Sequence, residues 1–248
     1  MKWLKKLAIL LTFSFFLSCG IQENYYLPQV PDSYISRTDI SAAVLNIPSI
    51  DSYSFSRGYR IFYRIYISDV TITGSIGPSE MNTINSVLAN DYNALLPIAN
   101  PANTTSITNR NTFINRNYFE LELEGRDLSE VLTSAGGTVS INFSQIPGTH
   151  PVLTINGNDY FLLRSRGEGT RIFSPKPEDR YFFSTPELNA YENAGASSDI
   201  NGDVAGRVDA SENAYVSMYI VAVGLDPSFQ RVYSKPTHIN IFRLPPQN

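Results

Sequence analysis

The sequence predicts a mainly β fold on three observations. Residue types that favour pleated sheet are abundant, including 15 tyrosines and 14 phenylalanines. Residues 59–67 alternate between two kinds of side chain with a period of two, as a strand with two different faces does. Asn156-Gly157 lies between two apolar runs and is the strongest short signal for a β-hairpin turn. Together they predict a folded body built mainly from strands.

The first element, residues 1–18, has the layout of a secretory signal. Lys2, Lys5 and Lys6 give it a positive start, and residues 7–17 follow as an apolar run. The run has about eleven residues, whereas a helix needs about 20 to span a bilayer. The pattern therefore favours an exported, cleaved signal over a retained transmembrane anchor.

Cys19 is the only cysteine of the chain and follows this signal directly. Phe16-Leu17-Ser18-Cys19-Gly20 resembles the lipobox of bacterial lipoproteins, with Phe16 where leucine is usual, as in the looser boxes of spirochaete lipoproteins. The resemblance implies cleavage before Cys19 and lipid on its sulfur, where two or more acyl chains give stable anchoring. The alternative is an ordinary signal peptide with an incidental cysteine.

The charge balance excludes some partners. The chain has 19 basic and 23 acidic residues, and without residues 1–18 the balance is 16 against 23. Such an acidic chain predicts no nucleic-acid partner, which would need a clustered basic face, and it disfavours lying flat on anionic lipid. Since Cys19 is the sole cysteine, neither an internal disulfide nor a thiolate metal site is expected.

Residues 19–40 are predicted to be the lipidated cysteine and an extended tether, in which Pro28 and Pro31 disfavour regular structure. Residues 41–248 then form the folded body. At about 3.1 Å per residue, the spacer before Tyr34 would reach roughly 40 Å.

The body begins with a short strand at Ala42–Ile47 and the clearest strand of the chain at Tyr59–Ile67. In the second strand Ile61 and Ile65 lie on one face, and Arg60 and Arg64 on the other. This predicts one core face and one wetter face.

The middle of the body is predicted to hold one helix, Ser79–Leu96, whose apolar stripe is interrupted by Asp91. A polar loop is expected at 97–117 and a helical turn at 127–132. Residues 118–123 alternate again, with Leu121 and Leu123 facing the core. The remaining predicted strands are 138–143, 152–155, 160–163, 181–184, 214–223, 231–233 and 237–242. Pro236 predicts an edge or a bend before the last of them.

Two stretches carry a further resemblance. Gly58–Ile67 looks like a central strand of an immunoglobulin or fibronectin type III β-sandwich, and Tyr215–Val223 with Tyr233-Ser234-Lys235-Pro236 looks like its last two strands. With the lipobox, the pattern is similar to treponeme-like spirochaete lipoproteins. The resemblance implies a sandwich and brings no catalytic residue. Because a plain module has about 100 residues, 75–212 is interpreted as a large inserted region with the helix and hairpins.

Asp199, Asn201 and Asp203 match the first half of a calcium loop, in which alternate oxygen ligands surround one cation. Val204 stands where that loop needs glycine, and Ala210 where it needs glutamate. A solvated turn is therefore the preferred interpretation, and no cofactor is predicted.

Other residues with catalytic chemistry form no recognised constellation. His150 and His238 lack the spacing of a zinc site or a triad, and Gly167-Glu168-Gly169 is interpreted as a turn. Glu120, Glu122 and Glu124 share one strand face at a spacing that glycosidase carboxylates can have, but a solvent-facing strand gives the same pattern.

Five tyrosines are candidates for an aromatic surface that binds a glycan or a protein, with ordinary core as the alternative. They are Tyr59, Tyr63, Tyr66, Tyr215 and Tyr219.

These observations together predict a membrane-tethered, extracytoplasmic lipoprotein of the cell envelope, in the outer membrane or at the surface rather than the inner membrane. Its body is expected to be a non-enzymatic structural or interaction module. The alternative is a carboxylate-based hydrolase acting on envelope polysaccharide.

Overall fold

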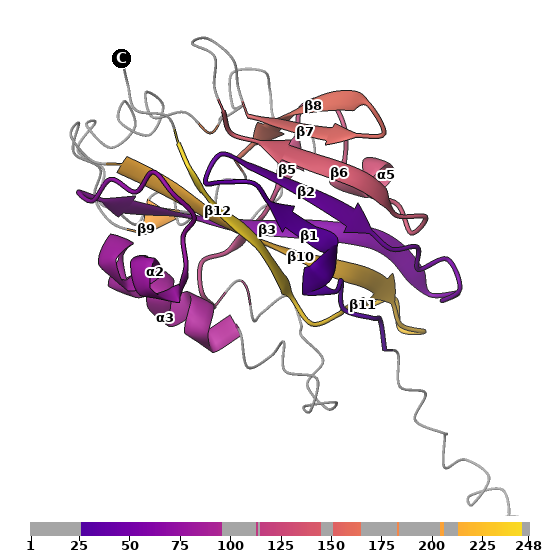
Figure 1. Ribbon diagram of the computed structural model, residues 1–248. Helices are drawn as coiled ribbons and strands as arrows, with labels where there is room; N and C mark the ends of the chain where they lie inside the picture. The colour runs from indigo at the N-terminus through magenta and orange to yellow at the C-terminus, as the bar shows by residue number, and fades with distance from the viewer. Residues whose placement is uncertain are drawn as a thin grey trace, which may run out of the picture.

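The computed structural model of the chain describes residues 26–95, 113, 115–144, 151–164, 183, 204–205 and 213–244. These residues form two β-sheets packed face to face, with a pair of helices on the outer face of the second sheet (Figure 1). The prediction of a mainly β, sandwich-like fold is confirmed.

The first sheet has the strand order β1-β2-β6-β7-β8-β5 and is antiparallel throughout. Its strands are β1 (Ile35–Arg37), β2 (Ala42–Ile47), β5 (Glu122–Leu123), β6 (Gly137–Asn142), β7 (Val152–Ile155) and β8 (Asn158–Leu163). Asn156 and Gly157 have φ angles of 50° and 82° and form the predicted hairpin turn between β7 and β8.

The second sheet is built around two strands of 13 residues, β3 and β10, which pair antiparallel from Asn213↔Ser68 to Gly224↔Ser56. Its strands are β3 (Ser56–Ser68), β4 (Phe119–Glu120), β9 (Val204–Ala205), β10 (Asn213–Leu225), β11 (Arg231–Tyr233) and β12 (Thr237–Arg243). Both β11 and β12 pair with β10, and Pro236 lies between them as the predicted bend. Only β9 runs parallel to its described neighbour, β3.

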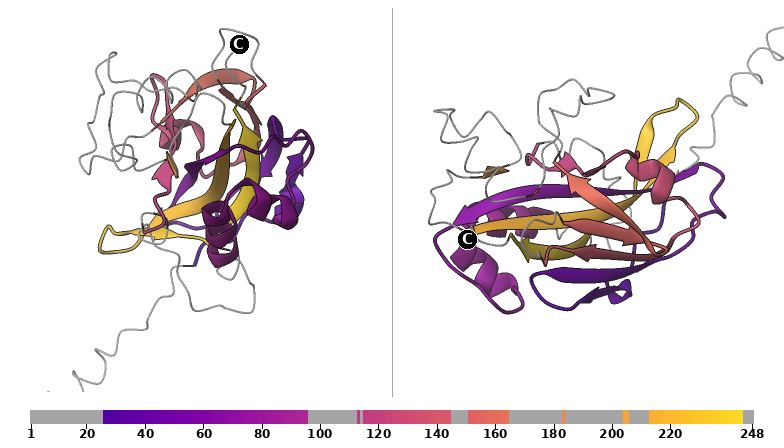
Figure 2. Two further views of the ribbon diagram at one scale, coloured as in Figure 1. Left: turned by 90° about the vertical axis from the view of Figure 1, so that its left-hand side faces the viewer. Right: turned by 90° about the horizontal axis from the view of Figure 1, so that it is seen from above.

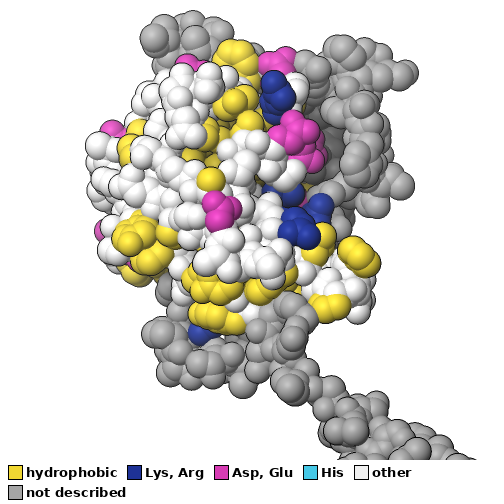
Figure 3. Space-filling view, turned by 90° about the vertical axis from the view of Figure 1, so that its right-hand side faces the viewer, with side chains coloured by type: hydrophobic (Ala, Val, Ile, Leu, Met, Phe, Trp, Pro, Cys, Tyr) yellow, Lys and Arg dark blue, Asp and Glu magenta, His cyan; other side chains and the backbone are white. Residues whose placement is uncertain are grey.

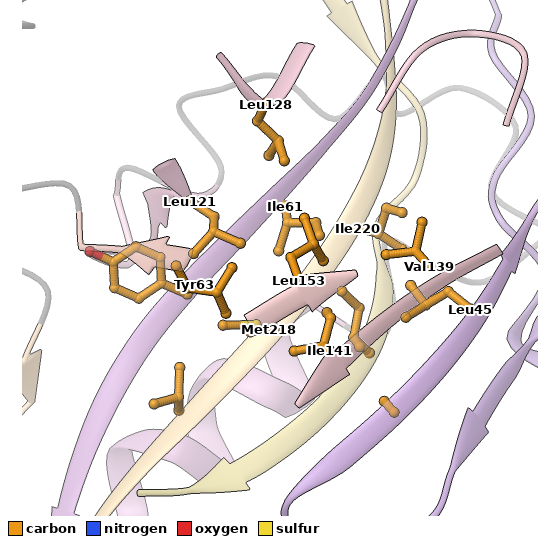
Figure 4. Packing of buried hydrophobic residues seen from close by; sticks show 14 of the residues in the cluster. Leu45, Ile61, Tyr63, Leu121, Leu128, Val139, Ile141, Leu153, Met218 and Ile220 are labelled. Carbon is orange, nitrogen blue, oxygen red and sulfur yellow. The ribbon is translucent and has the colours of Figure 1, made fainter. Parts of the chain in front are cut away.

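The main core lies between the two sheets. Alternate residues of β3 from Tyr59 to Ile67 face the first sheet, and each of them is at most 6% exposed. Figure 4 shows how Ile61 and Ile220 of the second sheet pack with Val139 and Leu153 of the first. Each such side chain contributes about 1.5–3 kcal/mol on burial, so this layer supplies most of the driving force for folding.

A second apolar layer covers the opposite face of β3 and β10. It is formed by α2 (Pro78–Ile84) and α3 (Ser86–Leu95), which lie against this sheet and away from β6 to β8 (Figures 1 and 2). The helices cover this face at Phe62 to Tyr66, and Glu120 of β4 pairs with Arg60. The face of β3 predicted to be wetter is therefore buried, and that prediction is wrong. Arg60 and Arg64 are only 5% and 8% exposed.

The predicted helix 79–96 is two helices, because Asn85 interrupts it with φ −164° and ψ 126°. Its side-chain amide donates to the carbonyl of Ile67 (3.0 Å) and its oxygen accepts from the backbone N–H of Val87 (2.8 Å). A side chain that bonds backbone in this way favours a cap over a helix interior. The turn predicted at 127–132 is confirmed as α5 (Leu128–Val131).

The segment predicted as a polar loop at 97–117 contributes at least one residue to the core. Phe113 is fully buried and stacks on Phe62 of β3, with ring centroids 4.2 Å apart. The predicted polar loop is wrong at this position.

Residues 119–123 pass from one sheet to the other. β4 pairs with β3, β5 pairs with β8, and between them the N–H of Leu121 donates to the carbonyl of Ile61 (2.8 Å). The expected alternation is confirmed here, with Leu121 and Leu123 buried. This crossing covers one corner of the sandwich.

The corner at β12 is covered by the connection between β1 and β2. The side chain of Asn240 donates to the carbonyl of Asp39 (2.7 Å), and the N–H of Arg243 donates to the carbonyl of Ile40 (2.8 Å). The backbone N–H of Arg243 on this edge strand is thereby occupied, which helps to protect the edge from pairing with another chain.

The extended tether predicted for residues 19–40 is shorter than expected, because the chain packs on the body from Leu27 onward. Leu27 and Val30 are 2% and 1% exposed and belong to the main core. Gln29 donates to the carbonyl of Pro236 (2.8 Å), and a short 3-10 turn at Asp32–Tyr34 leads into β1. Residues 27–40 of the predicted tether therefore belong to the folded body, and residues 19–25 lie outside the described residues.

The region 75–212 holds α2, α3, α5 and the predicted hairpin, and its strands β6, β7, β8 and β5 make up most of the first sheet. Of the strand predicted at 181–184, only Phe183 lies within the described residues. No helix in the described part of the chain is long and apolar enough to span a bilayer.

Candidate functional site

The most concentrated group of polar side chains in the described residues lies beneath the helices, around Asp91 of α3. One carboxylate oxygen of Asp91 accepts from Nη1 of Arg64 (2.6 Å) and from the hydroxyl of Tyr66 (2.7 Å). The other accepts from Nη1 of Arg116 (3.2 Å). The hydroxyl of Tyr118 lies 2.9 Å from that of Tyr66. We call these five residues the Asp91 cluster.

Local structure explains why these side chains meet. Arg64 and Tyr66 are two residues apart on β3 and so share the face that the helices cover. Asp91 lies on the buried side of α3 with Leu88 and Leu95, three and four residues away. The residue that interrupts the apolar stripe is therefore the counter-ion of a buried arginine, a partnership that the sequence analysis missed.

The electrostatics of the Asp91 cluster keep its hydroxyls protonated. Burial raises the pKa of Tyr66 well above its ordinary value, and burial raises the pKa of Tyr118 to about 12. Both phenols therefore stay neutral at physiological pH and can act as hydrogen-bond donors. The hydroxyl of Tyr118 also lies 3.3 Å from Oγ of Ser217, which extends the network to β10.

The hydrogen bonds of the Asp91 cluster favour a structural role over a catalytic one. The carboxylate of Asp91 accepts three hydrogen bonds, two of them from guanidinium groups, and Arg64 also donates to the carbonyl of Arg116 (2.8 Å). The cluster therefore joins α3, β3 and the segment before β4. A buried charge of this kind is costly when it loses its partner.

His238 of β12 lies beside the same helices, with its ring centroid 4.9 Å from that of Tyr219 and 5.2 Å from that of Tyr92. Part of the residue is exposed, but its Nε2 atom is buried without a hydrogen-bond partner. Burial, with a smaller contribution from Arg37, lowers the pKa of His238 to about 3. The ring is thus neutral, in keeping with the structural interpretation; His150 lies outside the described residues.

Of the three glutamates predicted on one strand face, Glu120 is ion-paired with two arginines. Its carboxylate lies 2.6 Å from Nε of Arg60 and 3.4 Å from Nη1 of Arg231, with 15% of the side chain exposed. Glu122 and Glu124 are half-buried. Because guanidinium groups occupy Glu120, the arrangement favours an ion-paired strand over a hydrolytic carboxylate pair.

The five candidate tyrosines are all in the core, which contradicts an aromatic binding surface at these positions. None of Tyr59, Tyr63, Tyr66, Tyr215 and Tyr219 is more than 2% exposed, so no ring face is open to a partner. The hydroxyl of Tyr59 donates to the carbonyl of Pro48 (2.5 Å), and that of Tyr215 to the carbonyl of Val70 (2.8 Å). Sequence alone could not separate the two interpretations, since both need the same alternation.

Other predicted positions lie outside the described residues: Cys19, Gly167–Gly169, Asp199, Asn201 and Asp203. Val204, the sixth position of the calcium-like loop, belongs to β9 and pairs with Ile65. Within the described part of the chain, no group of three or more His, Cys, Asp or Glu side chains is arranged to hold a metal ion.

The two most exposed large hydrophobic side chains in the described residues lie at one end of the sandwich, at the hairpin between β10 and β11. Phe229 at its tip is 83% exposed, and Tyr26 is 54% exposed. Figure 3 views this end and shows groups of hydrophobic side chains across its lower part.

No protein-family model, no curated protein and no solved structure matches the chain.

Proposed function

We propose that the protein is an extracytoplasmic lipoprotein, tethered to a membrane of the cell envelope through Cys19, whose body is a non-enzymatic structural or interaction module. The observation that carries this proposal is the position of the only cysteine, directly after a positive start and a short apolar run. A cysteine acylated there needs no bilayer-spanning helix to hold the body at the membrane.

The use of charged residues in the body supports a scaffold role. Asp91 and Glu120 are each ion-paired with two arginines, and these pairs connect β3 to its neighbours. Carboxylates committed in this way hold layers together and are poor candidates for acid–base chemistry.

We further propose that the sandwich is of the immunoglobulin or fibronectin type III kind. The order β12-β10-β3 corresponds to the order G-F-C in that fold. The first sheet departs from it, because β6, β7 and β8 from the middle of the chain lie next to β2. An elaborated sandwich accounts for both observations.

The tether is tested by acylation in a bacterial host that processes lipoproteins. The full chain should incorporate a labelled fatty acid and sediment with membranes, whereas Cys19→Ala should lose the label and be released or misprocessed. Ser18→Ala is the matched control, because it keeps a small residue before the cut and should retain the label. Label retained by Cys19→Ala, or none on the unmodified chain, would refute the lipoprotein proposal.

A further inference from the structure

The tip of the hairpin between β10 and β11 holds an aromatic ring away from the body. Phe229 is 83% exposed and has a φ of +59°, a conformation that bulky side chains rarely adopt. The turn is fixed by Asp226, whose side chain accepts from the N–H groups of Ser228 (2.9 Å) and Gln230 (2.8 Å). The ring is therefore held on an ordered turn, although an exposed ring does not add to the stability of the folded state.

The base of the same hairpin packs against two other apolar segments. Gly224 lies so close to Phe55 and Leu27 that a Cβ there would be 2.7 Å from one ring carbon and 3.2 Å from the leucine side chain. The N–H of Leu225 donates to the carbonyl of Phe55 (2.9 Å), and Tyr53 packs edge-on against Phe55. We call this end the hairpin end: Tyr26, Tyr53, Phe55, Leu225 and Phe229.

The chain enters the body at the hairpin end. In Figures 1 and 2 the start of the described chain lies at the same end as β11, and Leu27 touches Gly224. Tyr26 follows Cys19 by seven positions, and seven extended residues span at most about 25 Å. Phe229 lies five residues beyond Gly224, at most about 17 Å along a strand. A lipid on Cys19 would thus bring a bilayer within reach of the hairpin tip.

The charges at this end do not favour an anionic partner. Asp226 and the exposed Asp51 are acidic, Arg231 is paired with Glu120, and Arg57 at the start of β3 is exposed, so no basic cluster is formed. Exposed tyrosine and phenylalanine with little net charge suit the headgroup region of a neutral bilayer, where aromatic rings concentrate.

We propose that the hairpin end docks on the bilayer to which Cys19 is anchored, with the ring of Phe229 inserted at the interface of zwitterionic lipid. The inference rests on the proposed lipoprotein function. Docking would replace free rotation about the spacer by one orientation of the body, with the first sheet and the helices held away from the lipid.

The test uses tryptophan as a depth probe, because the only tryptophan, Trp3, leaves with the signal. Phe229→Trp and the control Phe161→Trp, at a residue of β8 that is 42% exposed, are made in the full chain. Each lipidated protein is reconstituted into phosphatidylcholine vesicles with and without bromine on the acyl chains. Matching circular dichroism shows that both variants are folded.

We expect the emission of Phe229→Trp to move to shorter wavelength by about 10 nm, with quenching by brominated lipid at least threefold stronger than in Phe161→Trp, since only a ring at the interface meets the bromines. Equal quenching in both variants, or none in either, would overturn docking. A shift of the 229 emission to shorter wavelength in whole envelope membranes, but not in pure lipid vesicles, would assign the surface to a protein partner. That result would also overturn docking on the bilayer.

Mass spectrometry of the same samples separates the two proposals. A lipidated protein with an unquenched 229 probe removes this inference alone. A protein without lipid on Cys19 removes the proposed function and this inference with it.

Discussion

Asp91 of α3 and Arg64 of β3 form an ion pair across 2.6 Å, with only 7% and 10% of their side chains exposed. Tyr66 and Arg116 complete the shell around the same carboxylate. This contact holds the helical layer on a sheet face that carries two arginines. Replacement of either partner would leave a buried charge without compensation.

Asp91→Asn should lower the free energy of unfolding by about 3–5 kcal/mol, because Arg64 keeps its charge and loses its counter-ion. Urea unfolding followed by circular dichroism measures this loss. Asp69→Asn is the matched control at an exposed position, and it should change stability by no more than about 0.5 kcal/mol. A loss below about 1 kcal/mol for Asp91→Asn would show that the pair does not hold the layers together.

Stability should fall between pH 7.5 and pH 5.5 because of His238. Its pKa is about 3 in the folded protein and 6.5 otherwise, so the unfolded chain binds a proton first as the pH falls. The stability is fully present only well above pH 6.5, and about 1 kcal/mol should be lost by pH 5.5. Tyr219, Tyr92 and the charge of Arg37 all face this ring.

To isolate this effect, the slope of the free energy of unfolding against pH is compared between the unmodified chain and His238→Phe. The variant should lose about 1 kcal/mol less over the same interval, whatever its absolute stability. Identical slopes would mean that His238 can be protonated in the folded state.

Gly58 and Gly157 both have positive φ angles, of 96° and 82°, but different surroundings. At Gly58 a Cβ would collide with the carbonyl oxygen of Leu132, whereas at Gly157 no atom lies within 4 Å. Gly157→Ala should therefore cost only the backbone strain, about 1–2 kcal/mol, and Gly58→Ala clearly more. Thermal unfolding of the two variants measures the difference, and equal costs would contradict the close approach of β3 to Leu132.

Phe229→Asn should raise the free energy of unfolding by about 0.5–1 kcal/mol. Asparagine tolerates the left-handed conformation better than phenylalanine does, and the exposed ring contributes no buried contact. Chemical denaturation of the protein in detergent tests this. A destabilised variant would show that the ring supports the fold.

The strands were predictable where the chain alternates and is bounded by turn residues. The hairpin at Asn156-Gly157 and the strand at 59–67 follow from local rules, and the structure has both. The alternation of Arg60 and Arg64 with apolar residues could not show whether the polar face meets water or a second layer. That outcome depends on Asp91 and Glu120, which are distant in sequence, so no local pattern reveals it.

The Asp91 cluster could have been anticipated only in part. A carboxylate within an apolar helical stripe indicates a buried partner, since a lone buried charge is expensive. The identity of that partner depends on how α3 is placed over β3, which the sequence does not specify. The same limit applies to the five core tyrosines, because a tyrosine on a strand face gives the same pattern whether another layer or a partner covers that face.

The pairing of β3 with β10 has a consequence for how the chain acquires its structure. The two strands are separated by about 150 positions, so the central contact of the sheet has a long loop to close and should form slowly. A chain that has not yet received residues 213–225 presents β3 with apolar and aromatic side chains on both faces and an open edge. Such a chain is prone to aggregate if synthesis stops before Asn213.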